Sequence, residues 1–507
     1  MLAKVLSGSV YGVDGFLVEV EVDLASGLPI WNVVGLPDAA VKEAKERVRA
    51  ALKNTGFSFP AERITVNLAP ADVRKEGSGF DLPMALGILA AQGRLNAEPL
   101  SAWLLAGELS LDGLIKPVNG ALPLALAARE KNLTGLVLPP ENGPQAAVVS
   151  GLEVKVAESL PEVVAFFNGQ GELKTPQRFV PEKEAAWSGP DMAEVKGQEA
   201  AKRALVVAAA GGHNLLLTGP PGAGKSMLAQ RLPSILPALS FEEALETSKV
   251  YSVLGRLNDG RHLIVERPFR SPHHTISEAG LIGGGSFPRP GEVSLAHNGV
   301  LFLDELPEFS KQALESLRQP IEDGLVTIAR AASALTFPAR FTLVAAMNPC
   351  PCGYLSHPTK NCRCTQTEIS RYRRRVSGPL LDRIDIQIEV GPVEVKDLEE
   401  PPQGATSSEL RPLVAAVRQR QAERFRGSAT RVNAQMAPAE IEAFCQLDDA
   451  GRKLLAAATT RLSLSARAYT RILKVARTIA DLANEDQIKT PHLAEAIQYR
   501  SLDREDR

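Results

Sequence analysis

The residues best suited to chemistry in this 507-residue chain form a glycine-rich loop in its middle third. The string GPPGAGKS runs from Gly219 to Ser226, after an apolar run and before a helical pattern. Amides of such a loop curl around an anion, and the helix N-terminus behind it adds a favourable dipole. We predict an ATP phosphate site in which Lys225 reaches the β- and γ-phosphates and Ser226 ligates Mg²⁺. The expected ATP-binding residues here are Gly219, Pro220, Pro221, Gly222, Ala223, Gly224, Lys225 and Ser226.

Two carboxylates end the strand-like run VLFLDE, which spans Val300 to Glu305. The carboxyl end of a parallel strand lies at the same edge of the sheet as a phosphate loop. We therefore expect Asp304 to complete the Mg²⁺ shell and Glu305 to orient or deprotonate the attacking water. The alternative is a buried strand that ends at an acidic surface turn.

Four of the five cysteines lie within fifteen residues, as CPC, nine intervening residues and CRC. Four thiolates satisfy tetrahedral zinc in number and charge, so we predict structural Zn²⁺ on Cys350, Cys352, Cys362 and Cys364. An iron–sulfur cluster is the second metal option. Small buried cysteines without a metal are the remaining alternative.

Composition limits the class of protein. Apolar residues make up 44% and charged residues 23% of the chain, as in an ordinary folded protein, and the length predicts two or three domains. Acidic residues interrupt the N-terminus where a signal peptide would be apolar, and no segment offers about 18 uncharged apolar residues. We therefore expect a cytoplasmic protein with no membrane partner. The net charge is −2, with 14 Lys and Arg against 19 Asp and Glu in residues 1–170, so the later part is the better candidate for DNA.

The elements that would position these groups fall into segments separated by two polar stretches. Residues 1–170 alternate β-rich and helical patterns and predict an α+β or α/β domain. Residues 171–190 hold three prolines and predict a linker, as does the acidic stretch 393–409. Between them, residues 191–392 alternate strands with helices, which predicts a mostly parallel sheet. Residues 410–507 show helical patterns only and predict a separate helical domain.

The phosphate loop, VLFLDE, LVAAMNP and SGPLLDRIDI together resemble the magnesium-chelatase-like branch of AAA+ ATPases. Within that branch the chain is most similar to the ComM or YifB-like group, over nearly its whole length. The resemblance implies a multidomain α/β protein: an AAA+ parallel-sheet core with a helical lid, preceded by a Lon-protease-like α+β domain.

The resemblance also assigns roles to residues outside the phosphate loop. It implies that Asn348 is the sensor between strands and that Arg383 is an arginine finger that reaches a neighbour's γ-phosphate. A fixed guanidinium there would stabilise the charge of the phosphoryl-transfer transition state. A salt bridge from Arg383 to Asp382 or Asp385 is the alternative. The remaining assignments are the second sensor, Arg467, and the adenine-flanking residues, Gly197 and Gln198.

The second sensor and the histidines of the pore insert each have an alternative assignment. Arg471 lies one helical turn from Arg467 on the same face and competes for the sensor role. The resemblance implies that the insert around RPFRSPHHTISEAG faces a central pore. An arginine that acts on a neighbour's nucleotide requires a ring, so the resemblance also implies a homohexamer, assembled with ATP or DNA. His273 and His274 fit pore-loop or packing roles better than a metal site, because adjacent histidines point in different directions.

The same resemblance implies a motor that acts on DNA, as a hexameric helicase that promotes branch migration during recombination in natural transformation. ISRYRRRVSG sets four arginines around Tyr372, of which we name Arg371, Arg373 and Arg374 as sequence-independent DNA contacts. RQRQAERFRGSATR sets five more around Phe425. A solvated helix face or inter-subunit salt bridges would explain both clusters equally well. The alternative function is a chelatase-like ATPase that remodels a partner protein.

Two strings of the N-terminal domain resemble the catalytic segments of Lon-type proteases. In AGELSLDGLIKPVNGALPLALAA the position of the catalytic lysine is Leu122, and in KEGSGFDLPMA the position of the serine is Gly79, beside Ser78. A serine without a lysine to take its proton is a poor nucleophile. We therefore predict that the Lon-like domain is not a protease.

Overall fold

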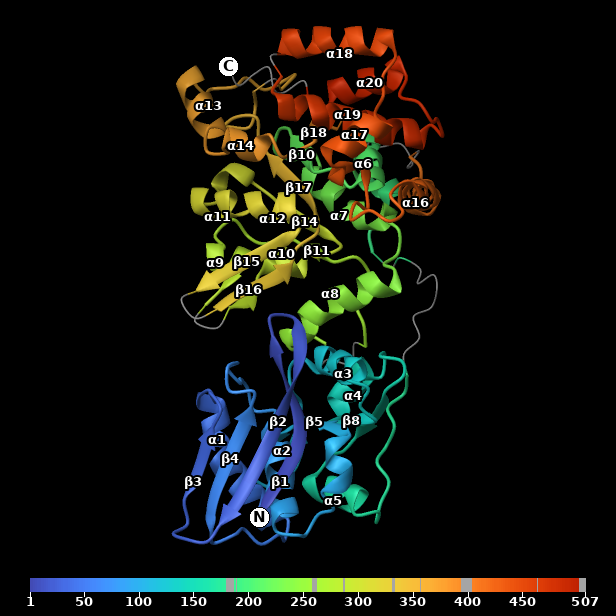
Figure 1. Ribbon diagram of the computed structural model, residues 1–507. Helices are drawn as coiled ribbons and strands as arrows, with labels where there is room; N and C mark the ends of the chain where they lie inside the picture. Colours follow the sequence, from blue (N-terminus) through green and yellow to red (C-terminus); the bar gives the residue numbers. More distant parts are fainter. Residues whose placement is uncertain are drawn as a thin grey trace. The chain divides into compact units, whose positions relative to one another are not determined.

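The computed structural model describes residues 1–178, 187, 189–257, 262–285, 288–330, 333–355, 357–393, 404–462 and 464–500. They form two compact units, each with its own core (Figure 1). Unit 1 comprises Met1–Lys183 and Ser240–Val265, and unit 2 comprises Glu184–Leu239 and Glu266–Arg507. The predicted domain boundaries did not anticipate that residues 240–265 pack with the N-terminal part. Residues 179–186 and 188 of the first predicted linker, residues 394–403 of the second and the last seven residues lie outside the described part.

Unit 1 is built on a mixed seven-stranded sheet with the order β3-β4-β2-β1-β5-β8-β9. Strands β1 (Leu2–Tyr11) and β2 (Asp14–Ala25) form an antiparallel hairpin, and β4 (Arg63–Ala69) pairs antiparallel with β2. The remaining strands pair in parallel, which is consistent with the predicted α+β class. They are β3 (Trp31–Val34), β5 (Trp103–Leu105), β8 (Gly135–Leu138) and β9 (Glu153–Val156).

Two helices of unit 1 show how local sequence and packing position them. Helix α1 (Ala39–Asn54) starts after Asp38, whose carboxylate accepts the Val41 N–H at 2.8 Å. Helix α2 (Asp81–Ala91) is buried at every residue, because it packs against β1 and β2 on one side and α1 on another. The other helices are η1 (Glu98–Ser101), α3 (Ala121–Glu130), η2 (Pro140–Asn142), α4 (Gly143–Ala146), α5 (Leu160–Phe167) and α8 (Phe241–Val253). Two short strands, β6 (Glu108–Leu109) and β7 (Ile115–Lys116), pair with each other outside the large sheet.

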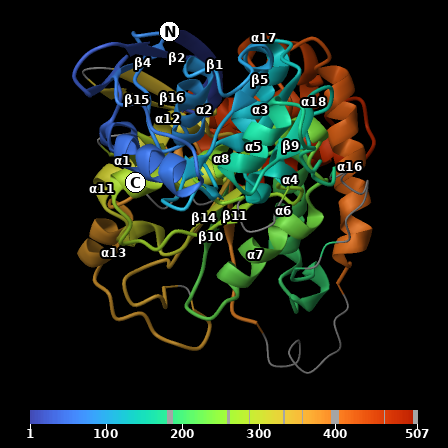
Figure 2. The same cartoon turned by 90° about the horizontal axis from the view of Figure 1, so that it is seen from below.

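Unit 2 contains a five-stranded parallel sheet with the order β11-β14-β17-β10-β18, as predicted for the core. Every residue of its three central strands is buried, because helices cover the sheet. Helices α6 and α7 pack against these strands (Figure 2). The bounds are α6 (Glu199–Gly211), β10 (Leu215–Thr218), α7 (Lys225–Ile235), β11 (Phe269–Arg270), β14 (Val300–Leu303), β17 (Thr342–Met347) and β18 (Ile386–Glu389).

Two groups of shorter elements interrupt this core. The first lies between β11 and β14 and holds α9 (Glu278–Ile282), β12 (Gly283–Gly284), β13 (Arg289–Pro290) and α10 (Glu292–Leu295). The second follows β14 and holds η4 (Leu306–Glu308), α11 (Lys311–Ser316), α12 (Arg318–Asp323), the hairpin of β15 (Leu325–Arg330) and β16 (Ser333–Pro338), α13 (Gln366–Arg373) and α14 (Gly378–Leu381). The short helix η3 (Met192–Glu194) precedes the core.

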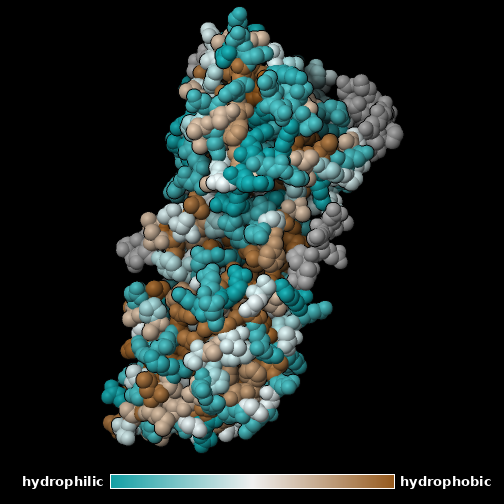
Figure 3. Space-filling view, turned by 45° about the vertical axis from the view of Figure 1, so that its right-hand side comes forward, coloured by the Kyte–Doolittle hydropathy of each residue, from teal (hydrophilic) through white to brown (hydrophobic). Residues whose placement is uncertain are grey.

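From residue 404 onward, the described residues form helices without any strand, as the pattern predicted. Hydrophilic side chains predominate on the face of this helical part that Figure 3 shows. Across the described residues, none of the helices has the length and apolarity needed to cross a membrane. The bounds are α16 (Ser407–Arg424), η5 (Asn433–Gln435), α17 (Pro438–Phe444), α18 (Asp449–Leu462), α19 (Ala466–Leu482) and α20 (Thr490–Gln498).

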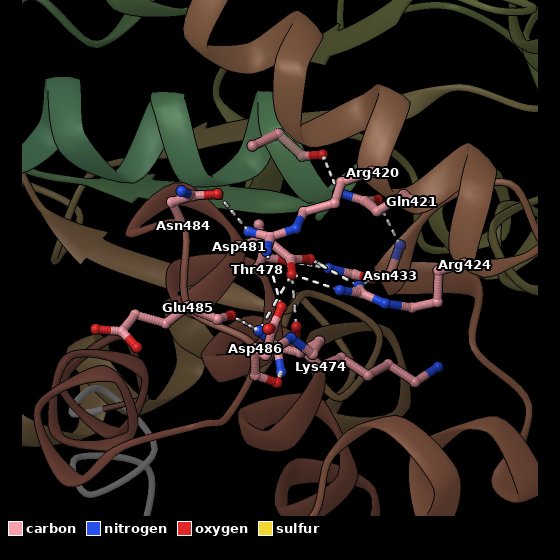
Figure 4. Close-up of polar contacts among 12 residues, drawn as sticks. Arg420, Gln421, Arg424, Asn433, Lys474, Thr478, Asp481, Asn484, Glu485 and Asp486 are labelled. Carbon is pink, nitrogen blue, oxygen red and sulfur yellow. Dashed lines mark hydrogen bonds and ion pairs between the residues drawn. The ribbon is translucent and has the colours of Figure 1, made fainter.

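A buried polar network joins the helical part to the core of unit 2 (Figure 4). Asp481 accepts two hydrogen bonds from Arg424, at 2.7 and 2.5 Å, and one from Asn433 at 2.8 Å. Gln421 extends the network by donating to the Ala210 carbonyl of α6 at 2.9 Å. Removing one partner of a buried charge leaves the other uncompensated, so such a network holds its elements in one arrangement. It thereby fixes α16 and α19 against the core.

Candidate functional site

The glycine-rich loop connects β10 to α7 and has the backbone of an anion cradle. Gly222 and Gly224 adopt positive φ angles of 78° and 85°, which side chains disfavour. At Gly219 a Cβ atom would lie 2.1 Å from the Val390 carbonyl oxygen, so only glycine fits there. The loop therefore has the conformational requirements that its sequence predicted.

Lys225 is buried beneath this loop and bound to it. Its Nζ donates to the carbonyl oxygens of Gly219 at 2.6 Å and Pro220 at 2.9 Å, and to Asn348 Oδ1 at 3.1 Å. Burial lowers the pKa of the Lys225 amine from its ordinary value. The predicted phosphate-binding lysine and the predicted sensor thus meet, although 123 positions separate them.

The two predicted Mg²⁺ ligands are also in contact. Ser226 Oγ donates to Asp304 Oδ2 at 2.6 Å, which joins the first turn of α7 to the end of β14. Hydroxyl and carboxylate oxygens are hard ligands of the kind Mg²⁺ prefers. The residues present therefore fit a magnesium ion held at the carboxyl edge of the parallel sheet.

Glu305 follows directly in a left-handed backbone conformation, with φ 52° and ψ 47°. Its carboxylate lies 3.1 Å from His274 Nδ1. His274 follows β11 and Glu305 follows β14, two strands that pair in parallel at Phe269–Val300 and Arg270–Leu301. The sequence predicted only pore-loop, packing or metal roles for His274 and did not predict this contact. The contact joins two segments that follow paired strands, and the sequence does not display that pairing.

Gln198, predicted to flank the adenine, contacts the phosphate loop. Its Nε2 donates to the Gly391 carbonyl at 2.6 Å and lies 3.4 Å from the Ala223 carbonyl. Gly197 and Gln198 both have positive φ angles, of 60° and 59°, just before α6 begins. The segment therefore makes a sharp turn beside the loop, where a base could stack; the adenine role of both residues stays a prediction.

Arg383 is held in a different part of unit 2. Its side chain is 5% exposed, forms an ion pair with Glu322 at 2.7 Å and donates to the Pro379 carbonyl at 2.7 Å. The predicted alternative, an ion pair with Asp382 or Asp385, is not what the structure shows. Arg383 lines an open depression with Arg318 and other residues of α9, α11, α12 and β15, and among the described residues none of the phosphate loop lines it. The arginine-finger role of Arg383 stays a prediction.

The two candidates for the second sensor differ in their surroundings. Arg471 forms an ion pair with the buried Asp385 at the start of β18. Burial alone would raise the pKa of Asp385, but the Arg471 guanidinium, the His213 ring and the Asn214 N–H together lower that pKa below its ordinary value. Arg467 lies exposed in the first turn of α19. Arg471 thus has a structural ion pair, and the sensor role of Arg467 stays a prediction.

The four clustered cysteines bring their sulfur atoms together, all within 4.8 Å of one another. Cys350 Sγ lies 3.4 Å from Cys352 Sγ and 3.6 Å from Cys362 Sγ. Zinc–sulfur bonds of about 2.3 Å in a tetrahedron put sulfurs about 3.8 Å apart, so this donor set fits a tetrahedral metal. The cluster also adjoins the phosphate loop, because a Cβ atom on Gly353 would lie 2.5 Å from Pro221 Cδ.

The arginine cluster on α13 is only partly available to a ligand. Arg371 and Arg374 are exposed and line an open depression, whereas Arg373 Nε donates to the Pro349 carbonyl at 3.4 Å. Tyr372 is buried, and its burial raises the pKa of the phenol to about 12. The buried ring is therefore not presented to nucleic-acid bases, and the DNA role of the arginines stays a prediction.

The second arginine cluster is used inside the protein. Phe425 is buried, and Arg424 is bound to Asp481. Arg418 donates to the Ala209 carbonyl at 2.6 and 2.9 Å, and Arg420 pairs with Asp486 at 2.8 Å. Arg424 and Arg420 thus form ion pairs within the chain and Arg418 bonds a backbone carbonyl, whereas the DNA role and the inter-subunit alternative both stay predictions.

The Lon-like segments hold no lysine at the expected position. Leu122 is fully buried in an apolar cluster with Leu104 and Val118. The Ser78 hydroxyl donates to the Glu108 carboxylate. A carboxylate can accept this proton but the arrangement is not the serine–lysine pair of the Lon pattern, so the absence of protease activity stays a prediction.

Comparisons with known proteins agree with these observations. The family description "Magnesium chelatase, subunit ChlI" matches residues 191–398, "Subunit ChlI of Mg-chelatase" matches residues 20–142, and "Magnesium chelatase, subunit ChlI C-terminal" matches residues 404–500. The chain is 48% identical to competence protein ComM of Haemophilus influenzae over 506 residues, covering 99% of this chain and 98% of that protein. It is 43% identical to the uncharacterized protein YifB of Escherichia coli over 505 residues, covering 99% and 98%. Lon protease 2 of Bacillus subtilis is 27% identical over 176 residues, which cover 31% of each chain.

Proposed function

The chain belongs to the ComM and YifB-like family of magnesium-chelatase-like AAA+ ATPases, and from this membership we propose that it is a hexameric ring motor that moves on DNA. One observation carries the ATPase part of the proposal. The contacts Lys225–Asn348 and Ser226–Asp304 unite the ends of three parallel strands at a cradle for phosphate. Those are the groups that bind and polarise a nucleotide triphosphate.

Each residue of this site has a distinct task in hydrolysis. The Lys225 amine would exchange its bonds to loop carbonyls for bonds to the β- and γ-phosphates, which offer more negative charge. Mg²⁺ between Ser226 and Asp304 would neutralise charge on the phosphates. Glu305 would orient the attacking water, and the His274 contact would set the direction of its carboxylate. Arg383 of an adjacent subunit would complete the site.

We further propose that the substrate is single-stranded or branched DNA, in cytoplasmic recombination during natural transformation. Two observations support DNA: a relative of 48% identity is a competence protein, and Arg371 and Arg374 present exposed positive charge on α13. The test is the ATPase rate without DNA and with single-stranded, duplex and branched DNA, together with strand displacement. If every DNA leaves the rate unchanged and no strand is displaced, the substrate is a partner protein instead.

Removing the exposed α13 arginines should weaken DNA binding evenly across sequences. The Arg371→Ala/Arg374→Ala double variant should flatten the plot of log Kd against log salt by about 1.4 to 1.8, because each lost phosphate contact accounts for about 0.7 to 0.9 of that slope. Basal ATPase should stay normal. Fluorescence anisotropy on two unrelated sequences measures the slopes.

The matched control for this prediction is Arg452→Ala/Lys453→Ala, which removes the same charge from exposed positions on α18. Arg373→Ala adds a second comparison, because that side chain bonds the Pro349 carbonyl. Equal slopes for the α13 and α18 variants would exclude α13 as the phosphate contact.

We propose that the four clustered cysteines hold structural zinc. Metal analysis should find about one zinc per chain, and Cys362→Ser should lose the metal and melt at lower temperature, because metal binding energy contributes to folding. Cys445→Ala is the control, since that buried thiol lies outside the cluster and the variant should keep its zinc. Iron with visible absorbance would instead identify an iron–sulfur cluster. A metal-free protein of unchanged stability with four titratable thiols would refute both.

A further inference from the structure

One segment between the phosphate-loop helix and the catalytic strands folds as part of unit 1. Ser240–Val265 follows α7 and precedes β11 in the sequence, yet it groups with Met1–Lys183 (Figure 1). Its helix α8 begins at a capping box, in which Ser240 Oγ accepts the Glu243 N–H at 3.2 Å. The segment is therefore a built element of unit 1 rather than a loose connection.

Ser252 at the end of α8 caps helix α3 from outside. The residue before α3, Gly120, has no side chain that could satisfy the first amides of the helix. The Ser252 carbonyl accepts the Gly120 N–H at 2.9 Å, and its hydroxyl lies 3.3 Å from the Leu122 nitrogen. The same hydroxyl donates to Gln145 Oε1 at 2.8 Å. Because Ser252 is fully buried, unit 1 would have unpaired polar groups without it.

Further contacts surround this cap. Leu245 packs against the apolar cluster that contains Leu122, and Lys249 forms an ion pair with Asp14 at the turn between β1 and β2. Leu122 occupies the position at which the Lon pattern would place the catalytic lysine. The leucine at this position thus belongs to the apolar cluster against which α8 packs.

The two ends of the segment are held together in unit 2 by Arg267. Its guanidinium donates to the Pro237 carbonyl at 2.6 Å on the outgoing end, and to the Asn298 carbonyl at 2.7 Å just before β14. The adjoining Pro268 carbonyl accepts the Val300 N–H at 2.8 Å. The chain therefore leaves and re-enters unit 2 at one point, where the end of α7 meets β14.

We propose that Ser240–Val265 is a linkage whose α8 stays anchored in unit 1 throughout the ATPase cycle, so that nucleotide-driven displacement of α7 against β14 is transmitted to the Lon-like unit. The inference rests on the proposed ATPase function. Packed elements transmit small shifts because they do not deform continuously. The proposed linkage gives the Lon-like unit a role that needs no peptidase chemistry, because this unit would receive the displacement produced in the ATPase core.

Locking the anchor and breaking it should have opposite outcomes. In Asp14→Cys/Lys249→Cys, a short bismaleimide joins α8 to the β1–β2 turn, and the cross-linked full-length protein should keep DNA-stimulated ATPase and strand displacement within about twofold of wild type. Ser252→Val should keep basal ATPase but lose strand displacement. Its α3 amides should exchange hydrogen at least about fivefold faster, because their caps are gone. The untreated double-cysteine protein is one control, and Thr459→Val, which removes a half-buried hydroxyl bonded to the Leu455 carbonyl within α18, is the other.

Charge exchange provides a variant that preserves the fold. Lys249→Glu should lower strand displacement, and Asp14→Lys/Lys249→Glu should restore it. Loss of ATP turnover on cross-linking would show that α8 leaves unit 1 during the cycle. Normal strand displacement in Ser252→Val, despite faster hydrogen exchange of the α3 amides, would show that no motion passes through the segment. Either result overturns the proposal. A wild type without ATPase activity would instead refute the proposed function, since hydrogen exchange reports on the anchor independently.

Discussion

Replacing Glu305 with glutamine should stop ATP turnover while ATP still binds. The substitution removes the carboxylate that orients water but leaves the Ser226–Asp304 contact and the Lys225 amine in place. Loss of a positioned general base costs about 10² to 10⁴ in rate. Single-turnover hydrolysis, measured beside equilibrium binding of a fluorescent ATP analogue, separates the two steps.

Two variants bracket this result. Lys225→Ala should abolish nucleotide binding itself, because the substitution removes the buried amine that is bound to the loop. Glu442→Gln, an exposed carboxylate on α17, should leave binding and turnover unchanged. Full ATPase activity in Glu305→Gln would remove Glu305 from the mechanism and direct attention to another water-orienting group.

Arg383→Ala should assemble normally and lose about 10³ to 10⁵ in ATP turnover, the effect of an arginine that stabilises phosphoryl-transfer charge. In the structure the guanidinium is paired with Glu322, so it must exchange that ion pair for a neighbour's phosphate. Glu322 is 45% exposed, and water can solvate it when the arginine is removed. Native mass spectrometry checks assembly, and a coupled assay measures the rate.

Mixing subunits tests whether Arg383 acts on the neighbour. Arg383→Ala keeps an intact phosphate loop, and Lys225→Ala keeps an intact arginine, so a mixed interface can join one functional half from each. Random mixing of equal amounts makes about a quarter of the interfaces complete in a closed ring. Activity should therefore appear in the mixture although neither variant has it alone. If the mixture of Arg383→Ala with Lys225→Ala is as inactive at every ratio as the mixture of Arg383→Ala with Lys225→Ala/Arg383→Ala, which lacks the arginine in both subunits, Arg383 does not act across subunits.

The sequence by itself determined the features whose residues are neighbours in the chain. The phosphate loop needs only a strand before it and a helix after it, and β10 and α7 occupy those places. The four cysteines lie within fifteen residues, so one loop can bring their sulfurs together whatever surrounds it. Buried runs such as VLFL also predicted parallel strands correctly, because a strand covered on both faces is apolar at every position.

Only the tertiary structure decided which distant groups meet and which remain accessible. His274 contacts Glu305 in the segments that follow the paired strands β11 and β14, and Arg383 pairs with Glu322 rather than with an aspartate beside it in sequence. Tyr372 and Phe425 lie in arginine-rich strings that predicted open nucleic-acid surfaces, yet both rings are buried. Residue type and spacing indicate what a side chain can do, whereas its exposure depends on the elements packed over it.

The same reason explains the placement of α8. Its capping box and apolar positions predict a helix, but they do not specify which core receives its buried face. That choice follows from complementary groups far away in sequence, above all the uncapped amides of α3 that Ser252 satisfies. A helix within the motor sequence therefore belongs to the Lon-like unit, because burial and hydrogen bonding are satisfied there in three dimensions and not along the chain.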